Sequence, residues 1–214
     1  MKIRFILAGE GSSDLRLAEH IENILISEGF SEVTGESPNL GLLAKKVGHS
    51  VKDKLHAITH YYPSADLIFV HRDADNVGVQ HRISEITDAA SELFIQDKTI
   101  PIIPVTMLET WLLADRAAIM RVAGAGNSKA GLTCLPATNK LESIRDSKTL
   151  LLEALCEASK TSGARREKFK KRFTEMRARL TYDLDPNGPV NDLDSYKSFR
   201  RSISAVAEQL LNHG

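Results

Sequence analysis

Hydrophobic and polar positions divide the first half of the chain into two alternating kinds of segment. Short apolar runs predict strands, and apolar residues that recur every three or four positions predict amphipathic helices between them. The predicted strands cover 2–8, 31–36, 67–70 and 99–105, and the predicted helices cover 17–25, 43–62 and 83–94. Pro101 and Pro104 favour an edge position or an irregular course for the last strand, since proline cannot donate to a β-ladder. The alternation predicts a three-layer α/β domain with a mostly parallel sheet.

The strand pattern fades after Leu108, and the rest of the chain is predicted to be helical. Helices are predicted over 107–121, 150–159, 165–180 and 192–211, with a loop rich in glycine and proline over 123–139. We therefore expect an α/β domain over residues 1–121 and a helical, basic extension over 122–214 that packs on it. The partly apolar last helix leaves room for a homo-oligomer.

Composition narrows the class of protein. The chain has 214 residues, of which 42% are hydrophobic, so it can bury a core without disulfides or metal ions. Its two cysteines suggest a reducing compartment. The first apolar stretch is too short for a signal peptide, and no apolar run has the roughly 18 residues that span a bilayer. We set aside secreted, membrane, disordered and repeat proteins, and we expect a cytoplasmic protein with no membrane partner.

The net charge of zero conceals an uneven distribution. Residues 1–115 contain 10 Lys and Arg against 17 Asp and Glu, so the second part of the chain is basic. Much of the basic excess lies between Lys160 and Arg179, a pattern typical of a nucleic-acid contact surface, although it also fits a solvated helix face. The residues expected to contact nucleic acid are Arg165, Arg166, Lys170 and Lys171.

Carboxylates follow two of the predicted strands. Glu10 comes after the first strand in a Gly-Glu-Gly turn, and Asp73 and Asp75 come after the third. Ligands of open α/β sheets bind beyond the carboxyl ends of the strands, so these three side chains converge if the two strands are neighbours. Carboxylates that share a site repel one another unless a hard cation such as Mg²⁺ (or Mn²⁺) lies between them. We therefore expect Glu10, Asp73 and Asp75 to bind a metal ion.

Other residues near these turns have two interpretations each. Gly11 and Ser12 precede a helix N-terminus, where free N–H groups could bind a phosphate. Arg72 could touch phosphate or neutralise the acids. Glu109 could complete the acidic site or interact with its own helix dipole. The default interpretation of Asp14 is a helix cap, and that of Trp111 is a core residue.

Three segments resemble known families. Residues 6–14 (Ile-Leu-Ala-Gly-Glu-Gly-Ser-Ser-Asp) and 69–75 (Phe-Val-His-Arg-Asp-Ala-Asp) resemble the TOPRIM domain of topoisomerases, primases and overcoming-lysogenization-defect nucleases. Residues 103–115, with Glu-Thr-Trp-Leu-Leu-Ala-Asp, are similar to a TOPRIM-like family called domain of unknown function 4276. The resemblance covers about residues 1–115 and implies a TOPRIM/Rossmann-like fold. Val77 stands where the topoisomerase pattern often has a further acid, which counts against a topoisomerase-type site.

The resemblance also implies roles. Asp73 and Asp75 would coordinate Mg²⁺, and Glu10 would act as a general acid/base or bind a second ion. The expected function is a Mg²⁺-dependent nuclease of TOPRIM type, and the resemblance implies a role in anti-phage defence with an ATPase partner. The chain itself has no G-x-x-x-x-G-K-[ST] loop with which to hydrolyse ATP. One alternative is a non-catalytic TOPRIM-like subunit that binds nucleic acid or nucleotide. Another is an enzyme that acts on a nucleotide sugar or a small phosphate ester.

Overall fold

Four parallel strands form one sheet with the order β2-β1-β3-β4. In the computed structural model the described residues are 1–9, 14, 16–43, 46–126 and 131–213, so Glu10, Gly11 and Ser12 lie outside them. The strands are β1 (Lys2–Ala8), β2 (Glu32–Glu36), β3 (Leu67–His71) and β4 (Thr99–Ile102). β4 lies at one edge of the sheet, which confirms the position that its prolines predicted.

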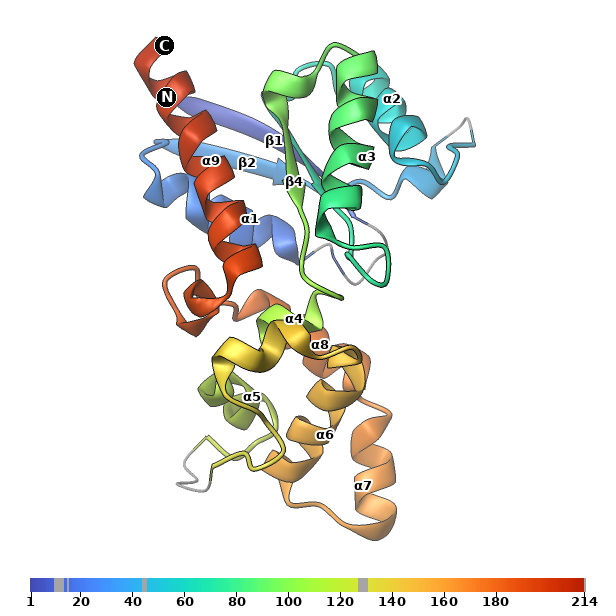
Figure 1. Ribbon diagram of the computed structural model, residues 1–214, viewed down its shortest axis with the longest axis vertical. Helices are drawn as coiled ribbons and strands as arrows, with labels where there is room; N and C mark the ends of the chain where they lie inside the picture. Colours follow the sequence, from blue (N-terminus) through green and yellow to red (C-terminus); the bar gives the residue numbers. More distant parts are fainter. Residues whose placement is uncertain (10–13, 15, 44–45, 127–130, 214) are drawn as a thin grey trace.

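Helices cover both faces of the sheet, which confirms the three-layer α/β prediction (Figure 1). One face packs against α1 (Leu17–Ser27) and α9 (Asp194–His213), and the other against α2 (Val51–Tyr61) and α3 (Val79–Glu92). Side chains alternate along β1, so that Phe5 and Leu7 belong to the first core and Ile6 and Ala8 to the second.

The remaining helices lie together beyond the end of β4 (Figure 1). They are α4 (Glu109–Leu112), α5 (Arg116–Val122), α6 (Ser147–Ser159), α7 (Gly163–Lys170) and α8 (Phe173–Tyr182). The core under α1 and α9 continues into this helical part without interruption. Trp111 is fully buried in it, stacks on Phe199 of α9 with 5.6 Å between ring centroids, and donates its indole N–H to Ser195 Oγ at 2.8 Å. The interpretation of Trp111 as a core residue is confirmed.

Three of the predicted helices are shorter or divided in the structure, and the one predicted over 165–180 is divided into α7 and α8. The helix predicted over 43–62 begins only at Val51, because Ser50 accepts a hydrogen bond from the Asp53 N–H and caps it. The helix predicted over 107–121 is divided into α4 and α5, because Asp115 Oδ1 accepts from the Ala118 N–H at 2.9 Å and starts a new helix. Short stretches of 3-10 helix connect other elements at Leu40–Leu42, Gln96–Lys98, Thr138–Ser143 and Pro189–Asp192.

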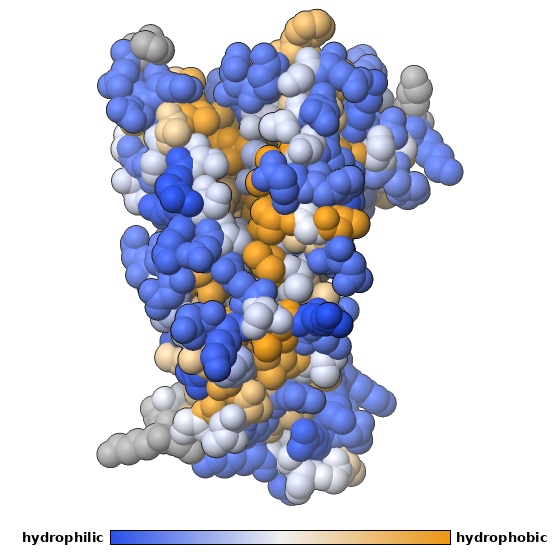
Figure 2. All heavy atoms as spheres, viewed as in Figure 1, coloured by the Kyte–Doolittle hydropathy of each residue, from blue (hydrophilic) through white to orange (hydrophobic). Residues whose placement is uncertain are grey.

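The surface in Figure 2 is mostly hydrophilic, with an apolar strip down the middle of this face. Part of that strip is a hollow of about 210 Å³ between α3, β4 and α9, lined by Ile83, Pro101, Ile103 and Phe199 among others. No helix in the described part of the chain is both long enough and apolar enough to cross a membrane.

Candidate functional site

The strand order reverses its direction between β1 and β3. The chain leaves β1 for β2 on one side, whereas β3 pairs with β1 on the other, with Ala8 opposite Val70. Ligands of open α/β sheets bind at such a switch point, outside the carboxyl ends of the strands. The sequence analysis expected the carboxylates that follow β1 and β3 to converge if these two strands are neighbours, and that condition is met.

The segment after β3 is held firmly against the segment after β4. The backbone N–H groups of Arg72, Ala74 and Asp75 donate to the carbonyl oxygens of Ile102, Pro104 and Thr106 at 2.9–3.1 Å. Asp75 and Thr106 have left-handed backbone conformations, with φ of 45° and 63°. Such conformations are costly for residues other than glycine and cluster at functional sites. The two segments therefore fix the positions of Asp73 and Asp75.

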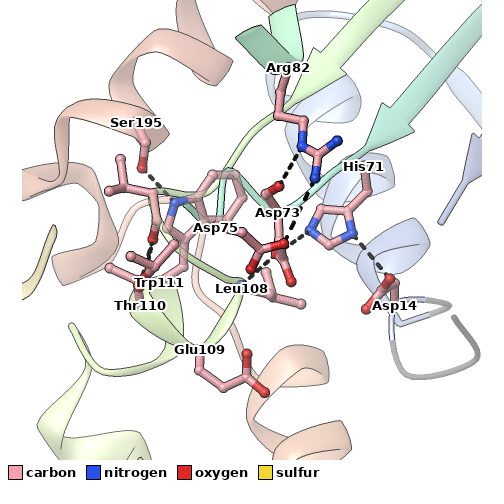
Figure 3. Close-up of polar contacts among 12 residues, drawn as sticks. Asp14, His71, Asp73, Asp75, Arg82, Leu108, Glu109, Thr110, Trp111 and Ser195 are labelled. Carbon is pink, nitrogen blue, oxygen red and sulfur yellow. Dashed lines mark hydrogen bonds and ion pairs between the residues drawn. The ribbon is translucent and has the colours of Figure 1, made fainter. Parts of the chain in front are cut away.

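Asp73 and Asp75 lie close together in the close-up of Figure 3. Asp73 Oδ1 accepts from the Leu108 N–H at 2.9 Å, and within the described residues its Oδ2 has no hydrogen-bond partner. The Asp75 side chain is 47% exposed, and its Oδ2 lies 3.9 Å from Arg82 Nη2. Arg82 also donates from Nε to the Asp73 carbonyl at 3.0 Å, so one arginine of α3 contacts both residues.

His71 is the buried neighbour of Asp73. Its Nδ1 lies 3.1 Å from Asp14 Oδ2, and its Nε2 lies 3.4 Å from Asp73 Oδ1 (Figure 3). Burial lowers the pKa of the imidazole, but the hydrogen bonds and charges of Asp14 and Asp73 outweigh burial and raise the pKa of His71 to about 9. His71 is therefore a cation at neutral pH that joins the two carboxylates.

Arg177 of α8 continues this network into the helical part. Its Nε donates to Glu109 Oε1 at 2.6 Å, and its Nη2 lies 3.6 Å from Asp14 Oδ1. All three side chains are buried. Asp14 thus lies between His71 and Arg177 and pairs with both cations. Glu109 likewise has a buried cation as its partner, which neither sequence interpretation included.

Two of the three residues expected to bind Mg²⁺ have carboxylate oxygens available for it. Mg²⁺ takes oxygen ligands and usually binds one or two carboxylates together with water. Asp73 offers an oxygen without a protein partner, and Asp75 offers a half-exposed carboxylate. Glu10, the third expected ligand, lies outside the described residues. Within the described ranges, no three His, Cys, Asp or Glu side chains gather closely enough to hold a metal ion.

Two cations near this edge were not singled out from the sequence. Arg82 approaches Asp75, whereas the expected cation, Arg72, has its Nη1 3.5 Å from Glu85 Oε1. Lys54 of α2 donates from Nζ to the Gly9 carbonyl at 2.9 Å, which places an ammonium group at the end of β1. Only the strand order brings α2 and α3 to this edge, and the sequence pattern did not give that order.

Arg177 could have been found from the sequence. Phe173, Met176 and Leu180 form the inward-facing stripe of α8, and position 177 falls within the same stripe at helical spacing. An arginine among apolar positions indicates a buried ion pair. Of the other basic residues expected to contact nucleic acid, Arg165, Arg166 and Lys171 are exposed, and Lys170 pairs with Glu167 at 2.9 Å.

Comparisons with known proteins found no similar protein. The chain matches no protein-family model, no curated protein sequence and no solved structure.

Proposed function

We propose that the chain is a metal-dependent nuclease of TOPRIM type, which hydrolyses phosphodiester bonds beyond the carboxyl ends of β1 and β3. One observation carries the proposal: Asp73 and Asp75 are fixed by backbone hydrogen bonds at the switch point of the sheet, at the end of a strand that pairs with β1. This is the place where an α/β sheet binds its ligands, and the residue types are those that Mg²⁺ prefers.

In this proposal, Asp73 and Asp75 hold Mg²⁺ or Mn²⁺, and Glu10 acts as a general acid/base or binds a second ion. Bound metal supplies stabilisation of the charge that develops on the phosphate. The Leu108 N–H and His71 hold the Asp73 carboxylate in one orientation. Arg165, Arg166, Lys170 and Lys171 contribute positive charge that binds the nucleic-acid backbone. The family resemblance further suggests an ATPase partner in anti-phage defence.

A non-catalytic, TOPRIM-like binding subunit is the second candidate, and His71 is the observation that favours it. A cation already lies 3.4 Å from Asp73 and neutralises part of its charge, so the acidic edge does not require a metal ion to be stable. A site of this kind would bind nucleic acid or nucleotide through the basic residues and would not cleave it.

The test compares wild type with Asp73→Asn and with Asp88→Asn, a matched control on the exposed side of α3. The substrates are single- and double-stranded DNA and RNA, with Mg²⁺ or Mn²⁺ present. We expect cleavage by wild type and the control, and at least a roughly 100-fold loss in Asp73→Asn, because loss of a ligand weakens metal binding more than loss of a supporting residue does.

A thermal-shift titration with the same metals gives an independent readout, because a ligand stabilises the folded state increasingly above its dissociation constant. Wild type and Asp88→Asn should be stabilised, and Asp73→Asn should not. Metal-independent nucleic-acid binding with no cleavage by any variant would contradict the nuclease and favour the binding subunit. Turnover of a generic phosphate ester without nucleic-acid binding would favour a small-molecule enzyme.

A further inference from the structure

A second hollow lies in the helical part of the molecule, beside α8. It has a volume of about 370 Å³ and lies between α5 and α8. Its lining residues on α8 recur at helical spacing, which places them on one side of that helix. The lining residues are Arg121, Val122, Arg172, Glu175, Met176, Arg179 and Asp183.

The three arginines of this hollow present donors that the protein does not use. Arg172 donates from Nε to Glu175 at 3.2 Å, and Arg179 donates from Nε to Asp183 at 2.9 Å. Each carboxylate therefore orients a guanidinium group by its Nε edge and leaves the Nη groups directed elsewhere. Arg121 has no hydrogen-bond or ion-pair partner among the described residues. Guanidinium groups held in this way are suited to bind a phosphate with two parallel hydrogen bonds.

The hollow also has an apolar part. Val122 is half-buried and Met176 is buried, and together they provide surface that water does not solvate well. The volume lies within the range of small-molecule sites. A ligand that matches both parts carries a phosphate beside a less polar group, as a nucleotide carries its phosphate beside its base.

The neighbouring charges favour a nucleotide that is part of a nucleic-acid strand over a free nucleotide. Lys171 directly precedes Arg172, and α7 carries further exposed cations without partners in the described part of the chain: Arg165, Arg166 and Lys168. Exposed cations that precede the pocket residues along the chain fit a ligand with repeated phosphates, which extends beyond a pocket for one unit.

We propose that the hollow between α5 and α8 holds one nucleotide of a single-stranded nucleic acid, with its phosphate on Arg121, Arg172 and Arg179. The inference rests on the proposed function only in taking nucleic acid as the ligand. Bases of a duplex are stacked and paired, so a duplex cannot place a base in the hollow without an unpairing cost of a few kcal/mol. The pocket therefore selects single strands.

The experiment measures binding of a labelled single-stranded oligonucleotide by fluorescence anisotropy, with a chelator present so that no cleavage occurs. The variants are Arg121→Gln and Arg179→Gln, and the matched control is Arg201→Gln on the exposed face of α9. We expect each pocket variant to bind about tenfold more weakly, as loss of a charged hydrogen bond predicts, and to have a shallower salt dependence. The control should bind as wild type does, and an unlabelled duplex should compete at least about tenfold less well than the single strand.

Equal weakening by the pocket variants and by Arg201→Gln would overturn the proposal, because binding would then follow total charge alone. A duplex that binds as tightly as the single strand would also overturn it. So would a free mononucleotide that competes as well as the strand, because the ligand would then be the free compound. A chain that binds strands through the hollow and never cleaves them would contradict the proposed nuclease and leave this inference intact.

Discussion

Two buried histidines, one in the packing core and one at the candidate site, have pKa values shifted in opposite directions. His20 and His71 are both almost completely buried, with exposed fractions of 2% and 1%. Burial lowers the pKa of His20 to about 4, with a smaller opposing effect from its hydrogen bond to the Leu184 carbonyl. The carboxylates beside His71 instead raise its pKa to about 9, against the effect of burial.

The difference lies in the partners and not in the depth of burial. His20 contacts the Leu184 carbonyl through Nδ1 and the Tyr196 hydroxyl through Nε2, both at 2.9 Å, so a neutral ring satisfies all of its hydrogen bonds. It joins α1 to α9 as part of the packing. His71 lies between two carboxylates, which stabilise the protonated, positively charged form of its ring. The two environments therefore differ in the groups that face the ring, which are carboxylates at the carboxyl edge of the sheet and a carbonyl and a hydroxyl between α1 and α9.

The largest expected effect comes from removing the cation that joins this charged edge to the helical part. Arg177→Met leaves Asp14 and Glu109 buried with one partner fewer each, so we expect a loss of about 3–5 kcal/mol in the free energy of unfolding, measured with denaturant. The matched control is Arg179→Met on the same helix, whose exposed pair with Asp183 should cost less than about 1 kcal/mol. Equal losses in the two variants would contradict the role of Arg177.

His71 should stabilise the metal-free protein most at low and neutral pH. Because the pKa is about 9 when folded and 6.5 when unfolded, the folded state binds more protons between these values. The contribution is complete below pH 6.5 and is lost as pH rises through 9, by about 3 kcal/mol in total. Denaturant unfolding from pH 6 to 9.5, with a chelator, should show this loss in wild type and not in His71→Gln. Parallel curves for the two proteins would mean that His71 is neutral.

His20 should give the opposite slope. Its pKa is about 4 when folded and 6.5 when unfolded, so the unfolded state binds the extra proton. The stability it contributes is complete above pH 6.5 and falls by at most about 3 kcal/mol as pH drops towards 4. His20→Gln should remove this part of the acid sensitivity in unfolding measurements. The exposed His56→Gln should change stability by less than about 0.5 kcal/mol, and a large change there would undermine burial as the cause.

The sequence predicted the helices and strands better than it predicted which residues contact one another in the fold. The apolar run at 67–70 and the two prolines at 101 and 104 were enough for β3 and for the edge position of β4, because strand burial and missing N–H groups are local properties. The limits of α2 and α5 depended on single capping residues, Ser50 and Asp115, which periodicity does not weigh.

The candidate site could be predicted only where it depends on residues that follow a strand. Asp73 and Asp75 were identified because the carboxyl ends of parallel strands share an edge. Their contacts with His71 and Arg82, and the link from Arg177 to Asp14 and Glu109, bring together residues up to 163 positions apart, and no local pattern encodes such pairings. The basic stretch was read as one surface, whereas Arg177 turns inward from it.

The return of α9 to the sheet has a consequence for synthesis of the chain. The face of β3 and β4 that carries Phe69 packs on Phe199, so that face stays uncovered while the ribosome makes the helical part. At elongation rates of about 5–20 residues per second, the interval between Ile102 and the end of α9 is roughly 5–20 s. During that time the nascent chain exposes an apolar sheet surface and an open strand edge, which makes it a substrate for chaperones that bind emerging chains.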